Sequence, residues 1–459
     1  MAKDWLGNDL STTDSTTVQA INDFSEGLLA YETKAGNVIA AAEADPGSAM
    51  ANAYAALAYM FLESPEAGGL AKSYLERAEA AKGATRREAM NIAAVRAWHA
   101  GDVPGAIRIG NEIADEFAHD LPMVKLTQYH EFNLGNAPGM LRVAEKVAEV
   151  NSDLCHMHGL SAFAYEQCHL LGDAETSARR AIELKRKEPW AHHALAHVLI
   201  TQGRIDEGID FLEDVSGTWN DLNSFMLTHN WWHLCLNYIS KGRYDDVLRA
   251  YDTHIWGADK SYSQDQIGAV SLLLRLELVG VDVGDRWQDV AQHMKGRTED
   301  FVQPFLTMQY VYGLARAGAP ETEAMMENLK AFVGRAPAHV QDAWINVAEP
   351  ACEALVAHAR GDHETVVRKM GSAISRIVEI GGSHAQRDLF EQVLLDSVIR
   401  TGRYSTAQQM LEMRRGYEPC SVPNNDKLAE VYQSLGLPRE AARAQARVTR
   451  VLNEAHQGR

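Results

Sequence analysis

The sequence contains few cysteines and no closely spaced cysteine pair. Its five cysteines, an odd number, are scattered over 459 residues without any Cys-x-x-Cys motif. Small secreted domains are stabilised by dense, even sets of cysteines, so that class is excluded. The first residues also lack the apolar segment and small-residue cleavage site of a secretory signal. We therefore expect a cytoplasmic protein.

Long apolar runs and an excess of positive charge are absent as well. No run of 18 apolar residues occurs, so we expect no membrane span and no membrane partner. The 44 basic residues are outnumbered by 62 acidic ones, which leaves a net charge of −18. A chain of this charge repels phosphate backbones. The clearest basic cluster, 179–187, is flanked by acidic residues and reads as a solvated helix face, so we predict no nucleic-acid partner.

The common catalytic and cofactor motifs are missing too. The sequence has no P-loop, no Gly-x-Ser-x-Gly, no His-Glu-x-x-His and no Gly-x-Gly-x-x-Gly after a strand. We therefore predict no cofactor. Whether the chain is an enzyme is left open by the motifs alone.

What the sequence does have is a glycine followed by a polar residue, recurring between helical patterns. These turns begin at Gly101, Gly135, Gly172, Gly203, Gly242, Gly361 and Gly402. The first five are 34, 37, 31 and 39 residues apart, and the last two are 41 apart. A period near 34 residues is typical of stacked helix–turn–helix units of the tetratricopeptide type.

Between the glycines, apolar residues recur at i, i+3, i+4 and i+7, and strand patterns are nearly absent. We predict an all-α, tetratricopeptide-like helical-repeat solenoid, curled or closed around a concave pocket. One continuous solenoid would contain N-terminal repeats over 1–256, an irregular helical segment over 257–336 and C-terminal repeats over 337–459. In the irregular segment the periodicity still predicts helices over 264–278, 287–293, 305–317 and 321–332.

Histidines are concentrated in one part of the chain, since nine of the 18 lie between residues 155 and 256. His193 and His197 are four residues apart on one predicted helix, and His229 and His233 repeat this spacing on the next equivalent helix. Residues at i and i+4 share a helix face. Such a pair suits a metal ion or two imidazoles that share a proton path.

Tetratricopeptide units, which this repeat resembles, line their concave face with positions about 13, 10, 6 and 3 before the turn glycine. This register places one set of polar and aromatic residues in the same groove: His193, His197, His229, Trp232, Glu166 and Tyr129. Each histidine has a structural alternative, a hydrogen bond to a neighbouring carbonyl. If the groove holds a metal at all, the ligands would be His193, His197, His229 and His233.

Several motifs resemble the tetratricopeptide repeat protein 38 family over nearly the whole length. They are Leu10-Ser11-Thr12-Thr13, Thr85-Arg86-Arg87-Glu88, Trp190 with His193, Ala196 and His197, His229-Asn230 with Trp232-His233, Tyr251-Asp252-Thr253-His254-Ile255, Gly284 with Arg286-Trp287, and Gly381-Gly382-Ser383 with Ala385-Gln386-Arg387-Asp388. The resemblance implies the solenoid fold but no established activity. It adds Asp252, His254, Arg387 and Asp388 as candidate ligand-binding residues. The family has an amide where this chain has His384, which predicts that His384 is not an essential ligand.

Three functions compete. The first is binding of a small molecule or a short peptide in the His- and Trp-lined groove. The second is a small-molecule enzyme in which His193, His197, His229, His233 and Glu166, with Asp388 as an alternative acid or base, perform acid–base or metal-assisted chemistry. The third is a protein-interaction scaffold. In all three, we expect a C-terminal repeat to bring Arg387 and Asp388 near the groove. The oligomeric state is left open.

A solenoid of this length buries enough apolar surface to fold without a metal. We expect chelation with EDTA to change the melting temperature of the purified chain by less than about 10 °C. About one zinc or iron ion per chain, together with a larger drop on chelation, would contradict this expectation. Metal analysis and a thermal melt before and after chelation provide the measurement.

Overall fold

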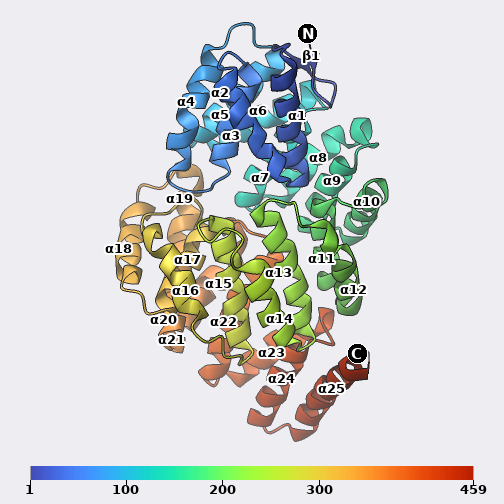
Figure 1. The fold of residues 1–459 in the computed structure, drawn as a ribbon. Helices are drawn as coiled ribbons and strands as arrows, with labels where there is room; N and C mark the ends of the chain where they lie inside the picture. Colours follow the sequence, from blue (N-terminus) through green and yellow to red (C-terminus); the bar gives the residue numbers. More distant parts are fainter. Residues whose placement is uncertain (1, 458–459) are drawn as a thin grey trace. The chain divides into compact units, whose positions relative to one another are not determined.

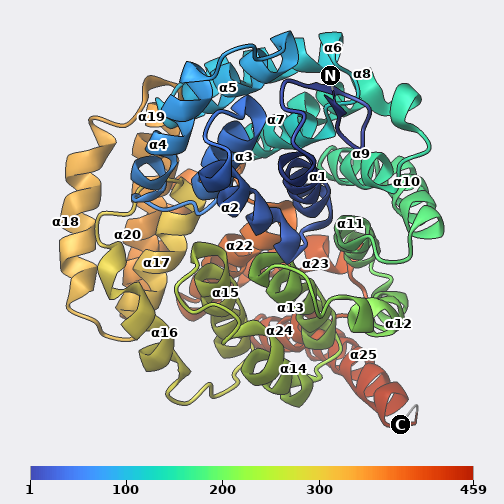
Figure 2. The same ribbon diagram turned by 45° about the horizontal axis from the view of Figure 1, so that its top comes forward.

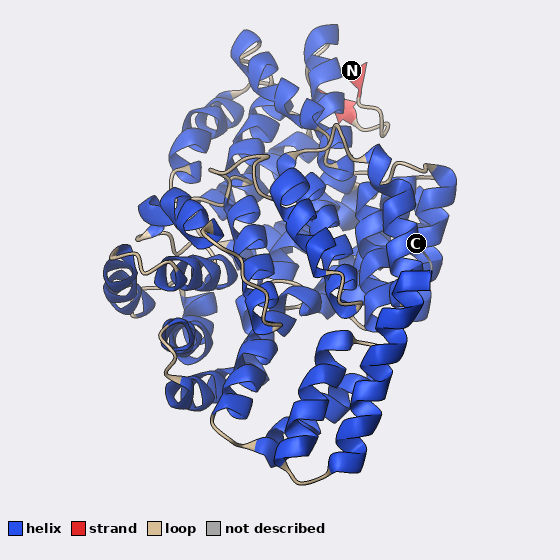
Figure 3. Ribbon diagram, turned by 60° about the horizontal axis from the view of Figure 1, so that its bottom comes forward, coloured by secondary structure: helices blue, strands red, loops and turns tan. Residues whose placement is uncertain are grey.

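The fold consists almost entirely of helices. A computed structural model describes residues 2–457 (Figure 3). Near the N-terminus, β1 (Ala2–Lys3) and β2 (Asp9–Leu10) form a short antiparallel ribbon. Within the described residues, every helix is too short or too polar to cross a bilayer. The predicted all-α, helical-repeat class is confirmed, whereas the curling around a concave pocket stays a prediction.

The chain forms two compact units whose limits differ from the three predicted segments. We call them the N-terminal unit, the residues up to Leu195 with Thr218–Met226, and the C-terminal unit, Ala196–Gly217 with the residues from Leu227 onward. Two helices, α11 (Pro189–Thr201) and α13 (Ser224–Ser240), contribute residues to both units.

The N-terminal unit is a series of helical hairpins, blue to teal in Figure 1. Its helices are α1 (Ser15–Ala30), η1 (Thr33–Gly36), α2 (Asn37–Ala44), α3 (Ala49–Met60), α4 (Ala67–Ala80), α5 (Arg86–His99), α6 (Val103–Glu116), α7 (Leu121–Asn133), α8 (Ala137–Ala148), η2 (Glu149–Asn151), α9 (Cys155–Gln167) and α10 (Leu171–Leu184). α3 packs on α4, α5 on α6, α7 on α8 and α9 on α10, and each hairpin packs on the next (Figure 2). Each hairpin thus buries its apolar face on a neighbour.

The C-terminal unit continues in the same way. Its helices are α12 (Ile205–Val215), α14 (Tyr244–Ala250), η4 (Tyr251–Ile255), α15 (Ser263–Leu278), α16 (Arg286–Met294), η5 (Lys295–Arg297), α17 (Pro304–Arg316), α18 (Glu321–Val333), α19 (Ala338–Ala343), η6 (Trp344–Ala348), α20 (Glu349–Ala359), α21 (His363–Ala373), η7 (Ile374–Ile380), α22 (His384–Arg400), α23 (Tyr404–Tyr417), α24 (Val422–Ser434) and α25 (Pro438–Gln457). Over 257–336, the segment predicted to be irregular, α15 to α18 match the four predicted helices within one or two residues. α15 also packs against α22, more than 100 residues further along the chain.

The predicted glycine turns have the expected backbone geometry, with one exception. Gly101, Gly135, Gly203, Gly242, Gly361 and Gly402 have φ values of 69° to 78°. This left-handed region favours glycine, which lacks a Cβ, and it commonly ends a helix. The turn predicted at Gly172 is wrong, because Gly172 lies inside α10 and His169, with φ 57°, takes the left-handed position.

The motifs that carry the family resemblance include links that connect distant helices of the N-terminal unit. Thr85 and Glu88 form a capping box at the start of α5, and Glu88 also accepts hydrogen bonds from the backbone and side chain of Ser11. The adjacent Arg87 is buried and pairs with Asp4 at 3.1 Å and Asp120 at 3.0 Å. This buried ion network connects the N-terminal segment, α5 and the start of α7.

Removing the Arg87 guanidinium leaves two buried carboxylates without their cation. We expect Arg87→Met to lower the free energy of unfolding by about 3–5 kcal/mol, the usual cost of breaking a buried pair on one side. Urea denaturation of the full chain measures this. The matched control is Arg108→Met, since Arg108 forms an exposed pair with Glu112 that is worth well under about 1 kcal/mol. Equal losses in the two variants would show that the buried network does not stabilise the unit.

Candidate functional site

Four histidines gather in the C-terminal unit, and we call them the histidine cluster. They are His197 of α11, His229 and His233 of α13, and His384 at the first position of α22. His197 and His233 are almost fully buried, and His229 is 9% exposed. Three helices that are far apart in sequence therefore bring imidazoles to one place.

The four rings contact one another in a chain. The Nε2 atoms of His229 and His233 are 3.2 Å apart, and Nδ1 of His197 lies 3.4 Å from Nε2 of His384. The rings of His197 and His233 connect these two pairs, with centroids 4.5 Å apart. In each nitrogen pair, one imidazole donates a hydrogen bond to the other, because two protonated or two unprotonated nitrogens would repel each other.

Trp232 lies against this cluster one helical turn from His229. The two rings are parallel, with an interplanar angle of 5° and centroids 5.3 Å apart, and the indole also contacts the edge of His233. Trp232 is 2% exposed, yet among the described residues no group accepts a hydrogen bond from its Nε1–H. A buried donor without an acceptor costs about 1–3 kcal/mol, so a water molecule or a polar ligand atom is expected to satisfy it.

Arg275 of α15 explains how His384 reaches the cluster. Its guanidinium lies 5.3 Å above the Trp232 ring, donates to Oγ of Ser271 at 2.5 Å and donates to the backbone carbonyl of Ala385 at 2.8 Å. Burial lowers the pKa of Arg275 to about 10, so the group stays charged at neutral pH. This one cation therefore ties α15, the Trp232 face of α13 and the first turn of α22 together.

His229 lies in a setting that disfavours charge. Burial, and next the proximity of His197, lower the pKa of His229 to about 3. A neutral imidazole has one donor and one acceptor nitrogen, so it can bind a ligand by either, coordinate a metal or carry a proton. The arrangement is suited to recognition of a polar group or to proton transfer, not to the binding of an anion by charged histidines.

The nitrogen–nitrogen distances in the two pairs are also compatible with metal binding. Two imidazole nitrogens bound to one tetrahedral zinc ion at 2.0–2.1 Å lie about 3.3 Å apart. The observed 3.2 Å and 3.4 Å match this separation. The residues therefore fit two imidazole ligands per ion without a large rearrangement.

Arg387 and Asp388 follow His384 by one helical turn on α22, and the structure places both in structural contacts. Arg387 donates to the carbonyls of Gly381 and Gly382 and so supports the turn before α22. Asp388 accepts from Arg414 at 2.5 Å and from Gln392 at 2.6 Å. Burial opposes ionisation, but Arg414 outweighs it and lowers the pKa of Asp388 to about 2. Both residues belong to the same helix as His384, whose ring contacts that of His197, and their closeness to the groove stays a prediction.

Asp252 and His254 belong to η4, a π-helical turn after α14. Arg286 forms two hydrogen bonds with Asp252, at 2.6 and 3.0 Å, and so joins η4 to α16. The ring of His254 stacks on Trp231 with centroids 3.8 Å apart. Both residues that the resemblance offered as ligand-binding candidates therefore make contacts within the fold.

The remaining candidates, Glu166, His193 and Tyr129, lie in the N-terminal unit. Tyr129 donates to Glu63 at 2.7 Å, Gln167 donates to Glu166, and His193 stacks on Trp190. Because the left-handed turn residue is His169, Glu166 lies three positions before the turn and not six. That these three share a groove with the histidine cluster stays a prediction.

Sequence reasoning discounted His384 and missed Arg275. His384 is two residues after Gly382, and no helical spacing relates it to His197, which is 187 positions away. In the sequence, the available signal was a single arginine within an apolar helical pattern. In the structure Arg275 is 2% exposed, and a charge that is buried to this extent needs polar partners. Neither residue could be assigned to the cluster without knowing that α15 packs against α22.

Comparison with known proteins identifies no family for this chain. No protein-family model matches it. Among solved structures, it is similar to a human IFIT1 dimer with m7Gppp-AAAA, at 14% identity, TM-score 0.41 and 96% coverage of both chains. It is also similar to the human IFIT1 dimer with PPP-AAAA, again at 14% identity and 96% coverage of both chains, with a TM-score of 0.40. TM-scores below 0.5 support no inference about ligands, so the proposals below depend on this chain's own residues.

The lowered pKa of His229 predicts a stability that falls with acidity. The neutral form is favoured in the folded chain, so this contribution is complete above the unfolded pKa of 6.5 and is lost as the pH falls toward 3. Between pH 8 and pH 5, we expect His229 alone to cost about 2 kcal/mol. In His229→Gln that part of the pH dependence should disappear. Urea denaturation at pH 8 and pH 5 measures the free energy of unfolding, with the exposed His293→Gln as the control. If the difference between the two pH values is the same in His229→Gln as in the wild type, the assignment is contradicted.

Proposed function

We propose that this chain is a helical-repeat binding protein that takes a small organic molecule at the histidine cluster of its C-terminal unit. The observation that supports this most strongly is the buried Nε1–H of Trp232, which has no acceptor among the described residues. Native structures rarely leave a buried donor unused, and an absent ligand is one established reason for an exception.

The surrounding groups suggest the chemistry of the molecule. An oxygen acceptor, such as a carboxylate, phosphate or amide carbonyl, would satisfy the Trp232 donor. The neutral imidazole of His229 offers either polarity, since it can exchange its donor and acceptor nitrogens. The buried charge of Arg275, behind the indole, favours an acidic or strongly polar ligand over a cation. A carbonyl of a short peptide would satisfy the same donor and is the alternative ligand.

Family and location belong to this proposal as well. Membership of the tetratricopeptide repeat protein 38 family is supported by the way the quoted motifs meet in pairs, Ser11 with Glu88 and Asp252 with Arg286. A cytoplasmic location is supported by the five cysteines, all of them free, since thiols persist in a reducing compartment. The acidic composition supports a partner other than nucleic acid.

A second candidate function is metal-assisted chemistry on a small substrate. The nitrogen separations of 3.2 and 3.4 Å, which match those of zinc-bound imidazoles, favour it. An ion held there would act as a Lewis acid toward a bound oxygen. The chain's own imidazoles would hold the ion or, without it, move a proton.

A pair of adjacent tryptophans allows a sharp test of the binding function. Trp232→Phe keeps an aromatic ring, although a smaller one, and removes the N–H; we expect it to weaken binding of small molecules by about 10-fold or more, the value of one hydrogen bond to a buried donor. The probes are a set of small carboxylates, phosphates and neutral amides, screened by ligand-detected NMR and titrated by calorimetry. Trp231→Phe is the matched control, since Trp231 stacks on His254, and its affinity should stay within about twofold of the wild type.

Identical affinities in the wild type, Trp232→Phe and His233→Asn for every compound that binds would refute the proposed site. Zinc titration distinguishes the second candidate function. If His233→Asn binds one zinc ion fewer than the wild type, the metal-assisted function is favoured. If zinc binds equally to both, the histidine cluster is not a metal site.

A further inference from the structure

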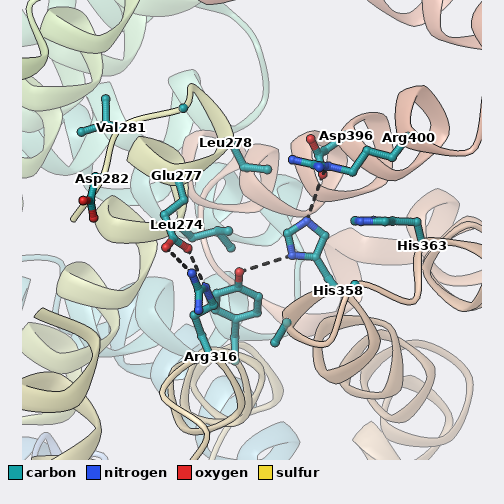
Figure 4. A pocket seen from close by; sticks show the side chains of 14 residues that line it. Leu274, Glu277, Leu278, Val281, Asp282, Arg316, His358, His363, Asp396 and Arg400 are labelled. Atoms are coloured by element: carbon teal, nitrogen blue, oxygen red, sulfur yellow. Dashed lines mark hydrogen bonds and ion pairs between the residues drawn. The ribbon is translucent and has the colours of Figure 1, made fainter. Parts of the chain in front are cut away.

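A second group of titratable residues lies around a pocket of about 500 Å³ within the C-terminal unit (Figure 4). The wall is formed by α15, α17, α20, the turn at Gly361, the first residue of α21, and α22. Three of the lining side chains are good metal ligands: His358, His363 and Asp396. None of them takes part in the histidine cluster, and the function proposed above does not use them.

These three residues point toward one another, as Figure 4 shows. Each has a ligand atom within 4.8 Å of the other two. His358 and Asp396 are the closest pair, with Nε2 of His358 3.3 Å from Oδ2 of Asp396. Two histidines and one carboxylate on one face of an ion, with further positions open, form the ligand set typical of non-haem iron(II) sites; similar sets bind zinc.

Each of the three residues also contacts a second polar group, although for Asp396 this group, Arg400, binds the same Oδ2 that faces His358. Nδ1 of His358 lies 3.3 Å from the hydroxyl of Tyr312, and Nδ1 of His363 lies 3.0 Å from Oγ of Ser397. Ligand histidines in metal sites almost always use their other nitrogen in this way, which fixes the tautomer and the ring orientation. Arg400 supports the carboxylate of Asp396 by a hydrogen bond of 2.8 Å.

We propose that His358, His363 and Asp396 form a binding site for a divalent transition-metal ion on the wall of this pocket, with its open coordination positions facing the pocket. The ion would be of the zinc, iron(II) or cobalt(II) class, which accepts imidazole and carboxylate together. A small oxygen-containing molecule in the pocket could then complete its coordination.

The protonation of Asp396 and His363 agrees with this assignment. Burial raises the pKa of Asp396, but the hydrogen bond from His358 and the charges of Lys427 and Arg400 outweigh it and lower the value to about 2, so the carboxylate is ionised. Burial lowers the pKa of His363, which favours the neutral form that binds metals. The positive charges of Arg400 and Lys427 repel a divalent cation. The negative charge of Glu277, also on the pocket wall, is neutralised by Arg316 and does not offset this repulsion.

The geometry requires one adjustment. Ligand atoms in cis positions around an ion with bonds of about 2.1 Å lie about 3.0–3.4 Å apart. His358 and Asp396 already satisfy this, and the ligand atom of His363, which lies within 4.8 Å of the other two, has to approach by at most about 2 Å. His363 is the first residue of α21 and is partly exposed, so a rotation of its side chain can provide this.

Cobalt(II) titration of the full chain tests the site, because cobalt bound by nitrogen and oxygen ligands absorbs visible light, and equilibrium dialysis with zinc gives the stoichiometry. We expect His363→Ala and Asp396→Asn each to weaken binding at this site by more than about 100-fold, since each removes a ligand. Ser397→Ala, which only releases Nδ1 of His363, should weaken it by about 10-fold. A purely structural role of these residues would leave metal affinity unchanged.

Two controls separate this site from others. His293→Ala removes an exposed histidine of the same unit and should bind cobalt as the wild type does. His229→Asn alters the histidine cluster, and it should retain the cobalt ion that His363→Ala loses. If His363→Ala and Asp396→Asn both fold, as judged by circular dichroism, and bind cobalt with wild-type affinity and stoichiometry, or if the wild type binds no cobalt at this site, the proposal is wrong.

Discussion

A helical hairpin can bury only one of its faces, so every hairpin in this chain depends on a neighbour to cover its apolar side. That requirement determines where the helices of each unit begin and end. It also explains why the turns are conformationally strict: a left-handed residue must reverse the chain within a few positions so that the second helix packs on the first. Where glycine is absent, as at His169, another residue adopts the left-handed conformation and the hairpin of α9 and α10 still forms.

Polar links between hairpins do what apolar packing does not, because they specify which helices meet. Arg87 joins three parts of the N-terminal unit, and Arg275 joins α15 to α22 in the C-terminal unit. Burying such charges is expensive unless each is fully paired, so they are strong indicators of a particular arrangement. Some motif residues that the resemblance singled out, such as Glu88 and Asp252, have this linking role, whereas Arg387 supports the turn just before its own helix. Trp232 does not have this linking role, and its buried N–H, like those of Trp190 and Trp287, has no acceptor among the described residues.

The two histidine groups of the C-terminal unit differ in what surrounds them. In the histidine cluster, imidazoles contact one another beside an indole, and the setting keeps His229 neutral. In the pocket, His358 and His363 face an ionised carboxylate, and each has a polar partner behind it. The first arrangement is suited to polar recognition or proton sharing, and the second to holding a cation with open positions. One unit can thus offer two chemically distinct sites because both are built at the packing of α22 against other helices.

The sequence by itself determined the local structure: the helical class, most turn glycines and the helices of 257–336, whose positions agree with the periodicity within one or two residues. It also placed His229 and His233 on one face, since a spacing of four is a property of the helix alone. The contacts of His384 with His197, and of His358 with Asp396, were decided only by tertiary structure. Helical periodicity depends on hydrogen bonds between residues four apart, whereas these contacts depend on which distant helices pack together and at what angle. Arg275 links α15 to α22 through the carbonyl of Ala385, and nothing in the sequence around Arg275 identifies that partner.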